Sequence, residues 1–443
     1  MRIIHHGGHT GVTGSCHQLK LDNGRSLLVD CGLFQGDDAH RHPDLEIEFP
    51  LDGIDSLILT HVHIDHVGRL PYLFAAGFRG NIYCTKPTAK MLPLTIEDAL
   101  KIGFTRNRRL INKFLNLVKD HLCPMEYQSW QDIPCGAQIK FKSAGHILGS
   151  AYVEIQAEGS KVIFSGDLGA PYAPLLKSPE APYSADTMVL ESTYGDKNHQ
   201  GRRERRQTLQ KILEKSLDDK GTTIIPAFGL GRTQELLYEI NAMLQQIETR
   251  RRFSLLKEVD VIVDSPLGGK FTKVYKDHDR FWDNEARRRL RTGDQPLIFE
   301  NLITVDDHRD HQRKVDYLDR SGRPAIVIAG SGMCTGGRVV NYLKRLLDDS
   351  RTDIVFVGYQ GRGTLGRDIQ ARRRSVEIDG RRYPIRADVH TLSGYSAHAD
   401  QSNLVNFVKR MRKRPKKVIL VHGETKAKRV LKGELQKLGV DVK

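Results

Sequence analysis

Residues 57–66 read Leu57-Ile58-Leu59-Thr60-His61-Val62-His63-Ile64-Asp65-His66. An apolar run typical of a buried strand leads directly into three histidines and one aspartate within six residues. Imidazole and carboxylate ligands at this density suit Zn²⁺, and manganese or iron fits by the same ligand logic. In the competing interpretation, His61 and His63 are ordinary loop residues and Asp65 caps the helix that follows.

Three more candidate ligands follow other apolar runs of the chain. They are His146 in Ser143-Ala144-Gly145-His146, Asp167 in Ser165-Gly166-Asp167 and His422 in Val421-His422-Gly423. A rigid sheet positions functional side chains on the loops at the carboxyl ends of its strands. The additional candidates therefore favour a metal site over the competing interpretation.

The order of strand and helix patterns predicts two domains, in agreement with a length of 443 residues. Short apolar runs followed by polar loops dominate the first half, for example at 57–59 and 162–164. From about residue 200 to 380, strand patterns such as 223–225 and 326–328 precede longer helical patterns, which indicates βαβ units and a parallel sheet. Beyond this region the pattern of the first half returns, with apolar residues before polar ones at Val389 before His398 and at 418–421 before His422.

Charge and cysteine usage narrow the class of protein. The formal net charge of +15 attracts polyanions, of which nucleic acid is the dominant one in the cytoplasm. The six cysteines lie apart with no Cys-x-x-Cys pair, so we expect free thiols in a reducing compartment rather than a zinc ribbon or a disulfide scaffold. No apolar run approaches the length that spans a bilayer. We therefore expect a cytoplasmic protein without membrane contact.

These motifs together resemble the metallo-β-lactamase superfamily, and specifically its β-CASP nucleic-acid-processing branch. The seven matching positions occur in family order along essentially the whole chain: Asp30, 61–66, His146, Asp167, Glu191, His398 and His422. The resemblance implies an α/β fold, a metallo-β-lactamase αββα sandwich with an inserted β-CASP α/β domain that contains a parallel sheet. We expect the first domain at residues 1–198 and 383–443 and the inserted domain at 199–382.

The resemblance also implies two Zn²⁺ per chain, with Mn²⁺ as an alternative metal. The ligands of one zinc are then His61, His63 and His146, and those of the other are Asp65, His66 and His422. Asp167 bridges the two metals. Asp30 becomes an acceptor that fixes the orientation of one metal-bound imidazole. In the competing interpretation, Asp30 is a turn aspartate before Gly32.

The implied reaction is hydrolysis of phosphodiester bonds by a metal-activated water, which leaves 5′-phosphate and 3′-hydroxyl ends. By resemblance, His398 protonates the departing oxygen and Glu191 holds its ring, so the expected catalytic residues are His398, Glu191, Asp65 and Asp167. In the competing interpretation, His398 merely begins a helix beside a cap at Ser396.

The expected substrate is single-stranded RNA. RNA-processing members of the branch carry histidine at the position of His422, whereas Artemis-type DNA nucleases typically carry valine. Basic clusters suit a phosphate backbone, although each one alone is more often a solvated helix face: 106–113, 202–206, 250–252, 287–291, 372–374 and 409–417. The sequence does not distinguish endonucleolytic from 5′ to 3′ exonucleolytic action. It also leaves open whether the protein forms a homodimer. Alternatives are a DNA nuclease, a hydrolase of a small thioester or lactone, and a metal-free RNA-binding scaffold.

Two glycine-rich turns of the insertion, 228–233 and 330–338, lie between a predicted strand and a predicted helix. Backbone amides at such helix starts favour anions, but glycines there also serve tight packing of a sheet, and both interpretations stay open. The candidate RNA phosphate contacts are Gly231, Arg232, Ser331, Gly332, Ser393 and Ser396. We assign no metal role to His5, His6 and His9, because the ligand set is complete without them.

Overall fold

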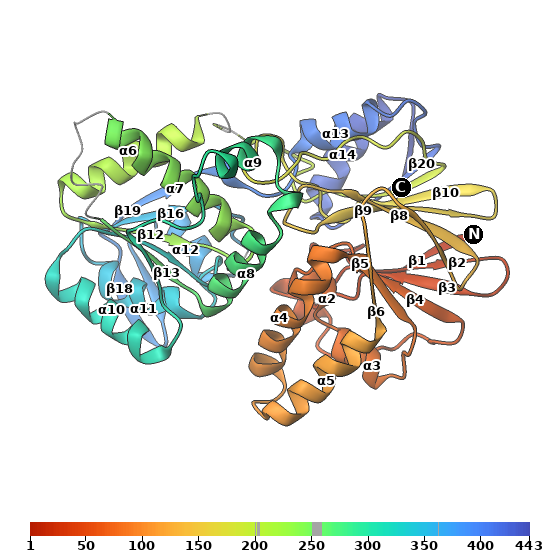
Figure 1. Cartoon of the computed structure of the whole chain (residues 1–443), viewed down its shortest axis with the longest axis horizontal. Coiled ribbons are helices and arrows are strands. Elements are labelled where there is room, and N and C mark those ends of the chain that lie inside the picture. The colour runs from red at the N-terminus through yellow and green to blue at the C-terminus, as the bar shows by residue number, and fades with distance from the viewer. Residues whose placement is uncertain (200, 202–203, 250–258, 362) are drawn as a thin grey trace. The chain divides into compact units, whose positions relative to one another are not determined.

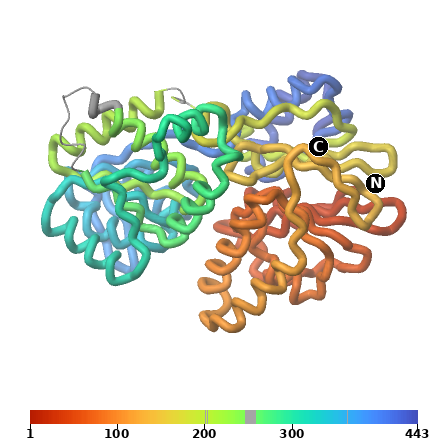
Figure 2. The backbone as a smooth tube through the Cα atoms, in the orientation of Figure 1, coloured from red at the N-terminus to blue at the C-terminus, as the bar shows by residue number. Residues whose placement is uncertain are grey.

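The computed structural model describes residues 1–199, 201, 204–249, 259–361 and 363–443. Contacts group the chain into two compact units. Unit 1 comprises Met1–Pro171, Leu176–Asn198 and His398–Lys443, and unit 2 comprises Tyr172–Leu175 and His199–Ala397. Figure 2 shows the C-terminal segment, in blue, returning to the unit in which the chain begins. Within the described ranges, every helix is too short or too polar to span a lipid bilayer.

The first sheet of unit 1 has the strand order β1-β2-β3-β4-β5-β6. Its first three strands are antiparallel, and β3 to β6 run parallel. The turn between β2 and β3 uses Gly24 at φ 82°, a left-handed conformation that glycine adopts without strain. The strands are β1 (Arg2–Gly7), β2 (Cys16–Lys20), β3 (Ser26–Val29), β4 (Ile54–Ile58), β5 (Asn81–Thr85) and β6 (Leu122–Met125).

The second sheet of unit 1 has the order β21-β20-β11-β10-β9-β8-β7. Strands β7 to β10 form an antiparallel meander, and β10, β11, β20 and β21 run parallel. The strands are β7 (Trp130–Ile133), β8 (Ala137–Ser143), β9 (Ala151–Ala157), β10 (Ser160–Phe164), β11 (Thr187–Glu191), β20 (Lys417–Val421) and β21 (Asp441–Val442).

The two sheets pack against each other through one hydrophobic core, to which β3 contributes Leu27 and β10 contributes Phe164. A second core joins the other face of the second sheet to α13 and α14. Figure 1 shows helices outside each sheet, so the layer order is the predicted αββα sandwich. The helices of unit 1 are α1 (Asp37–Arg41), α2 (Ile64–Val67), α3 (Leu70–Ala75), α4 (Lys86–Gly103), α5 (Arg108–His121), α13 (Gln401–Lys409) and α14 (Thr425–Gln436).

Unit 2 is built on a parallel sheet of order β14-β13-β15-β12-β16-β19, which confirms the predicted parallel sheet. Its strand β15 is buried along its whole length, as expected where helices cover both faces. Its strands, with those of a separate hairpin (β17, β18), are β12 (Thr222–Pro226), β13 (Asp260–Asp264), β14 (Leu302–Thr304), β15 (Ala325–Ala329), β16 (Asp353–Phe356), β17 (Ser375–Ile378), β18 (Arg381–Pro384) and β19 (Asp388–Thr391).

Helices lie on both faces of this sheet in Figure 1, with α6 and α7 on one side and α10 and α11 on the other. The helices of unit 2 are α6 (Arg205–Asp218), α7 (Arg232–Thr249), α8 (Pro266–Asp277), η2 (Asp279–Phe281), α9 (Asn284–Arg291), α10 (His308–Ser321), α11 (Arg338–Leu346), α12 (Leu365–Gln370) and η3 (Ser393–Tyr395). The basic cluster 250–252, with residues 202 and 203 of the cluster 202–206, lies outside the described residues.

Residues 383–397 group with unit 2 because of one strand. β19 pairs in parallel with β16, Asp388 opposite Asp353, and forms the edge of the unit 2 sheet. A division at residue 383, where the sequence places the boundary, would take this strand from the sheet. The strand pattern at Val389 thus belongs to the unit 2 sheet rather than to a sheet of unit 1.

Candidate metal centre

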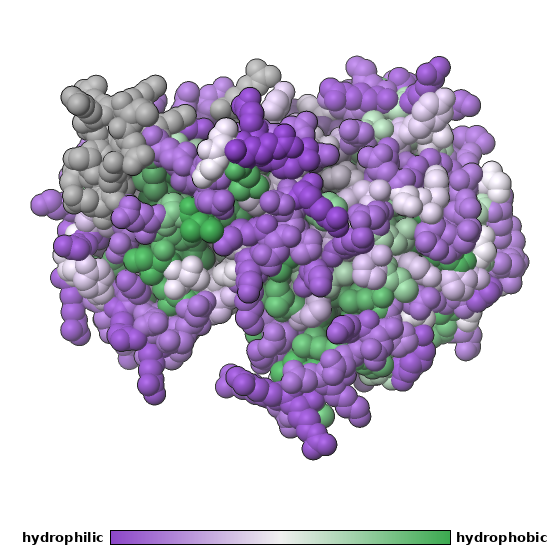
Figure 3. Space-filling view, viewed as in Figure 1, coloured by the Kyte–Doolittle hydropathy of each residue, from purple (hydrophilic) through white to green (hydrophobic). Residues whose placement is uncertain are grey.

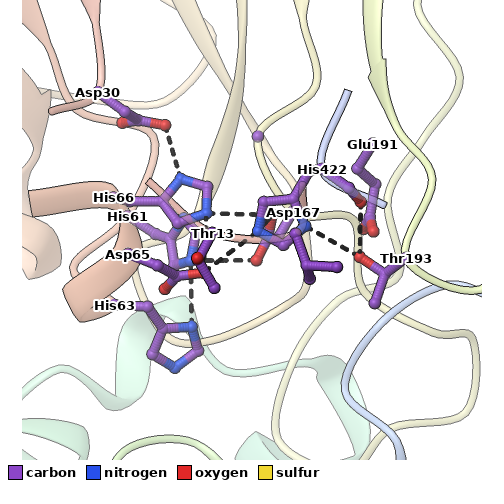
Figure 4. A network of polar contacts seen from close by, with 12 residues as sticks. Thr13, Asp30, His61, His63, Asp65, His66, Asp167, Glu191, Thr193 and His422 are labelled. Carbon is purple, nitrogen blue, oxygen red and sulfur yellow. Dashed lines mark hydrogen bonds and ion pairs between the residues drawn. The ribbon is translucent and has the colours of Figure 1, made fainter. Parts of the chain in front are cut away.

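The ends of four strands in unit 1 carry the predicted ligands. His61 and His63 follow β4, His146 follows β8, and Asp167 follows β10. His422 comes directly after β20, while Asp65 and His66 lie in the short helix α2. Buried, well-packed strands fix the backbone at each of these points, so the ligands can meet in one place. Figure 4 shows the side chains of His61, His63, Asp65, His66, Asp167 and His422 close to one another.

A first set of four ligand atoms has the spacing of a tetrahedral metal site. Nε2 of His61 and Nε2 of His146 each lie 3.1 Å from Nδ1 of His63. Oδ2 of Asp167 lies 3.5 Å from the nitrogen of His61 and 3.6 Å from that of His146. Ligands about 2.1 Å from a tetrahedral zinc are about 3.4 Å from one another. These four atoms therefore fit one Zn²⁺.

A second set of four atoms lies beside the first. Nε2 of His422 lies 3.2 Å from Oδ2 of Asp65 and 3.5 Å from Oδ1 of Asp167. Nε2 of His66 lies 3.3 Å from the same Asp167 oxygen and 3.9 Å from Oδ2 of Asp65. Asp167 thus turns one carboxylate oxygen toward each set, as a bridging ligand does.

Buried atoms without a hydrogen-bond partner support the same fit. Nε2 of His66 and Oδ1 of Asp167 are both buried and lack such a partner among the described residues. A buried polar atom left unpaired is costly, and a cation between these two atoms removes the cost at both. Burial also lowers the pKa of His61 to about 3 and that of His63 to about 4. These imidazoles are therefore neutral at neutral pH, which is the form that binds a metal.

Asp30 holds one imidazole of each set. Its Oδ2 accepts from Nδ1 of His66 at 2.8 Å and from the hydroxyl of Thr60 at 2.7 Å. The Thr60 hydroxyl in turn lies 3.1 Å from Nδ1 of His61, from which it accepts. In both rings the proton is on Nδ1 and Nε2 is left for a metal. Asp30 has φ 60°, so the turn of the competing interpretation is present as well.

His398 lies beside the first set of ligands. Its Nδ1 is 3.3 Å from Oε2 of Glu191 and 3.9 Å from Oδ2 of Asp167. Glu191 is completely buried, and its Oε1 also accepts from the backbone N–H of Leu168 at 2.6 Å. Burial disfavours the imidazolium form, but the charges of Glu191 and Asp167 outweigh it and raise the pKa of His398 to about 9. A protonated His398 can donate a proton to a departing oxygen.

The helix caps of the structure differ from those in the competing interpretations. Helix α2 begins after His63, so Asp65 lies inside its first turn and does not cap it. Helix α13 has its cap at Asp400, whose side chain accepts from the N–H of Asn403, and Ser396 lies outside that helix. Asp65 therefore does not cap a helix, and His398 does not begin one, as the competing interpretations required.

The candidate RNA contacts all lie in unit 2. The N–H of Gly231 donates to Gln234 at 2.7 Å, and the buried Arg232 forms an ion pair with Glu235. A side chain at Gly332 would come within 2.9 Å of the Phe228 ring, so close packing explains that glycine. Ser331 contacts Thr335 within its turn, while Ser393 begins η3 and Ser396 follows its end. The contacts described for these residues are with other residues of unit 2, and their contact with RNA stays a prediction.

One contact of a predicted ligand involves a residue that sequence reasoning did not identify. The hydroxyl of Thr193 lies 3.0 Å from Nδ1 of His422. Thr193 stands two residues after Glu191 in Glu191-Ser192-Thr193, at the end of β11. Its position after a strand, two residues from the predicted site residue Glu191, is the feature of the sequence that could have identified it.

Known protein families and relatives match this chain over most of its length. Three family models match: the metallo-beta-lactamase superfamily at residues 5–119, the Beta-Casp domain at 233–369 and the Zn-dependent metallo-hydrolase RNA specificity domain at 382–443. The "Ribonuclease TTHA0252" of Thermus thermophilus is 38% identical over 426 residues, which cover 96% of this chain and 93% of that protein.

More distant matches extend the likeness. The "Transcription termination factor FttA" of Methanosarcina mazei is 31% identical over 442 residues, and the alignment covers 96% of this chain and 67% of the relative. A crystal structure of a protein of unknown function from Enterococcus faecalis V583 matches with a TM-score of 0.54 and 11% identity, over 100% of this chain and 97% of the other. At that identity the structural match shows the fold alone.

Proposed function

The chain belongs to the β-CASP branch of the metallo-β-lactamase superfamily, a family of metal-dependent hydrolases, and on this premise we propose that it is a zinc-dependent ribonuclease. Its substrate in this proposal is single-stranded RNA. Its products carry 5′-phosphate and 3′-hydroxyl ends.

The observation that carries the proposal is the pair of ligand sets that share Asp167. The residues His61, His63 and His146 would hold one metal, and Asp65, His66 and His422 would hold the other. A pair of Zn²⁺ ions supplies the Lewis acidity that lowers the pKa of water and neutralises charge at phosphorus during an in-line displacement.

The residues of the chain supply the remaining proton. When a water attacks phosphorus, the 3′ oxygen of the preceding nucleotide leaves and needs a proton. His398 is the donor in this proposal, because it lies beside the first ligand set and its pKa is raised. Glu191 accepts from Nδ1 of His398, which directs Nε2 to the substrate. The downstream fragment keeps the phosphate at its 5′ end, and the upstream fragment ends in a 3′ hydroxyl.

Charge and relatives support RNA as the substrate. A net charge of +15 attracts a polyanion. A relative of 38% identity that aligns over nearly its whole length is named a ribonuclease, and the family model at 382–443 is described as an RNA specificity domain. The same features do not favour a small neutral thioester or lactone.

The test is a cleavage assay on zinc-loaded protein. The substrates are a 5′-labelled single-stranded RNA, the DNA of the same sequence and a panel of thioesters and lactones. We expect RNA cleavage with 5′-phosphate and 3′-hydroxyl ends, and none by Asp167→Ala. Internal fragments would indicate an endonuclease, and mononucleotides released from the 5′ end an exonuclease. Faster turnover of DNA or of a thioester, with RNA left intact, would overturn the proposal.

A further inference from the structure

A strongly basic loop lies in unit 1 between α13 and β20, far along the chain from most of the metal ligands. This basic loop, residues 409–417, reads Lys409-Arg410-Met411-Arg412-Lys413-Arg414-Pro415-Lys416-Lys417, with seven cations in nine residues. No aspartate or glutamate occurs from residue 401 to residue 423. The charge is therefore not balanced within the segment itself.

The basic loop is held in place by the segment that precedes β11. The N–H of Lys413 donates to the carbonyl of Tyr183 at 3.0 Å, and the N–H of Lys416 donates to the carbonyl of Asp186 at 3.0 Å. Met411 and Pro415 are buried beneath the loop. With its apolar side chains turned inward and its backbone paired, the loop presents its cationic side chains to solvent.

Few carboxylates neutralise these cations. Lys409, Arg410, Arg412 and Lys413 are exposed, and none forms an ion pair within the described part of the chain. Lys416 is 3.3 Å from Asp186, but its side chain is 86% exposed. Such an exposed pair contributes little and leaves the charge available to a ligand. In Figure 3, hydrophilic side chains gather over α13 and α14, the helices next to the loop.

Aromatic side chains stand among the cations. Tyr183 is 56% exposed, and the guanidinium of Arg412 lies 5.9 Å from the centre of its ring. Farther along the same sheet, Trp130 is 38% exposed, with the ammonium of Lys140 4.4 Å and that of Lys161 5.8 Å from its ring. The N–H of Lys161 also donates to Asp186, the residue whose carbonyl accepts from Lys416 of the basic loop.

We propose that Tyr183 and the basic loop form a second binding site for single-stranded RNA, outside the metal centre. The inference rests on the proposed function, because it places another segment of the same substrate. Cations hold the phosphates, and an exposed ring stacks on a base, which is the combination that single strands require. The exposed ring of Tyr183 beside Arg412 favours a nucleic-acid strand over an acidic protein partner, because a base stacks on such a ring.

The position of the basic loop defines which part of the RNA it binds. Lys417 begins β20 and His422 follows its end, so the five-residue strand separates the loop from the metal ligand. At the rise of a β-strand this distance is about 17 Å. The site therefore acts on RNA that extends well beyond the cut, and it increases the affinity for long substrates without changing the reaction itself.

The test compares two sets of substitutions that remove the same charge. The first variant carries Arg412→Gln, Lys413→Gln and Lys416→Gln. The control carries Arg2→Gln, Lys20→Gln and Lys90→Gln, three cations that are exposed in the same unit and lie outside the basic clusters. The affinity for a long single-stranded RNA and the cleavage rate of an RNA trinucleotide are measured at several salt concentrations.

We expect the first variant to bind long RNA at least about tenfold more weakly, with a salt dependence reduced by about two ions. Its cleavage of the trinucleotide stays at the wild-type rate, which also shows that the metal centre is intact. Tyr183→Leu weakens binding about fivefold, and Tyr183→Phe keeps it, since phenylalanine stacks as well.

Equal loss of affinity in the control would overturn the inference, because net charge alone would then explain the result. Unchanged affinity for long RNA in the first variant would overturn it as well, while the ribonuclease proposal would stand on the trinucleotide result. Failure of the zinc-loaded wild type to cleave either RNA counts against the proposed function, and the binding measurement still decides whether the loop holds RNA.

Discussion

The hydroxyl oxygen of Thr193 lies 3.0 Å from Nδ1 of His422. The same hydroxyl donates to the carbonyl oxygen of His422 at 3.2 Å, so it accepts the proton of the imidazole. His422 is thereby held with its proton on Nδ1, which leaves Nε2, 3.2 Å from Oδ2 of Asp65, as the ring atom in the second ligand set. Through this contact Thr193, two residues after the end of β11, orients His422, the ligand that follows β20.

We expect Thr193→Val to weaken metal binding by about tenfold, because groups that orient a metal-bound histidine typically contribute this much to affinity. Valine keeps the shape of the side chain and removes the hydroxyl. Thr193→Ser keeps the hydroxyl and serves as the matched control. Competition between each protein and a chelator of known zinc affinity gives the measurement. Equal affinities for the valine and serine variants would show that the contact does not orient His422.

A second prediction concerns metal number. Asp167 turns one oxygen toward each ligand set, whereas His146 belongs to one set only. We expect Asp167→Ala to lose the metal of both sites and the cleavage activity with it, and His63→Ala to lose cleavage as well. His146→Ala should retain about one ion per chain, because the second set keeps all its ligands. Native mass spectrometry counts the ions, and two ions on Asp167→Ala would contradict a bridging carboxylate.

A third prediction separates proton donation from metal binding. His398→Ala should keep both zinc ions and cleave RNA about a hundredfold or more slowly, the usual contribution of a general acid. A phosphodiester with a p-nitrophenolate leaving group needs no proton, so the variant should hydrolyse it at nearly the wild-type rate. Glu191→Gln should behave in the same direction with a smaller loss. An equal loss on both substrates would exclude His398 as the acid.

The sequence was informative about the metal ligands for a physical reason. Metal chemistry restricts ligands to a few residue types, and strands place them at their carboxyl ends. The run His61 to His66 could therefore be recognised beside its strand, and the distant His146 and His422 completed the pattern. The structure brings all of them within two adjacent sets of ligand atoms.

Other features could not be predicted from local sequence. The strand at Val389 was expected in the first domain, but it pairs with β16 of unit 2. An apolar run indicates a strand without specifying its partner, because pairing is decided by packing of residues far apart in the chain. Thr193 was missed for a related reason, since threonine is common and its hydroxyl becomes informative only beside Nδ1 of His422.

The last prediction concerns the stability of unit 2. Asp264, at the end of β13, is fully buried and accepts from Nδ1 of His311 at 2.7 Å, the hydroxyl of Tyr342 at 2.6 Å and the guanidinium of Arg338 at 2.6 Å. Burial alone would raise the pKa of Asp264, but these three hydrogen bonds outweigh it and lower the pKa. Asp264→Asn leaves buried donors without their charged partner, and we expect it to destabilise unit 2 by about 3 kcal/mol.

The sign of the pH dependence follows from the lowered pKa. A carboxyl that binds its proton less readily in the folded state stabilises the fold above its unfolded pKa, and this contribution is lost as the pH falls toward the folded pKa. Wild-type unit 2 should therefore lose stability below about pH 5, and Asp264→Asn should lose less over the same range. Asp260→Asn, at the partly exposed start of β13, is the matched control and should follow the wild type.

Fluorescence can follow unit 2 alone. The chain has two tryptophans, Trp130 in unit 1 and the buried Trp282 in unit 2. In a Trp130→Phe background, the emission of Trp282 reports urea unfolding of unit 2 without a signal from unit 1. If Asp264→Asn and the wild type show parallel stability curves between about pH 5 and pH 3, Asp264 does not carry the acid sensitivity, because removal of the titrating carboxylate must flatten the curve.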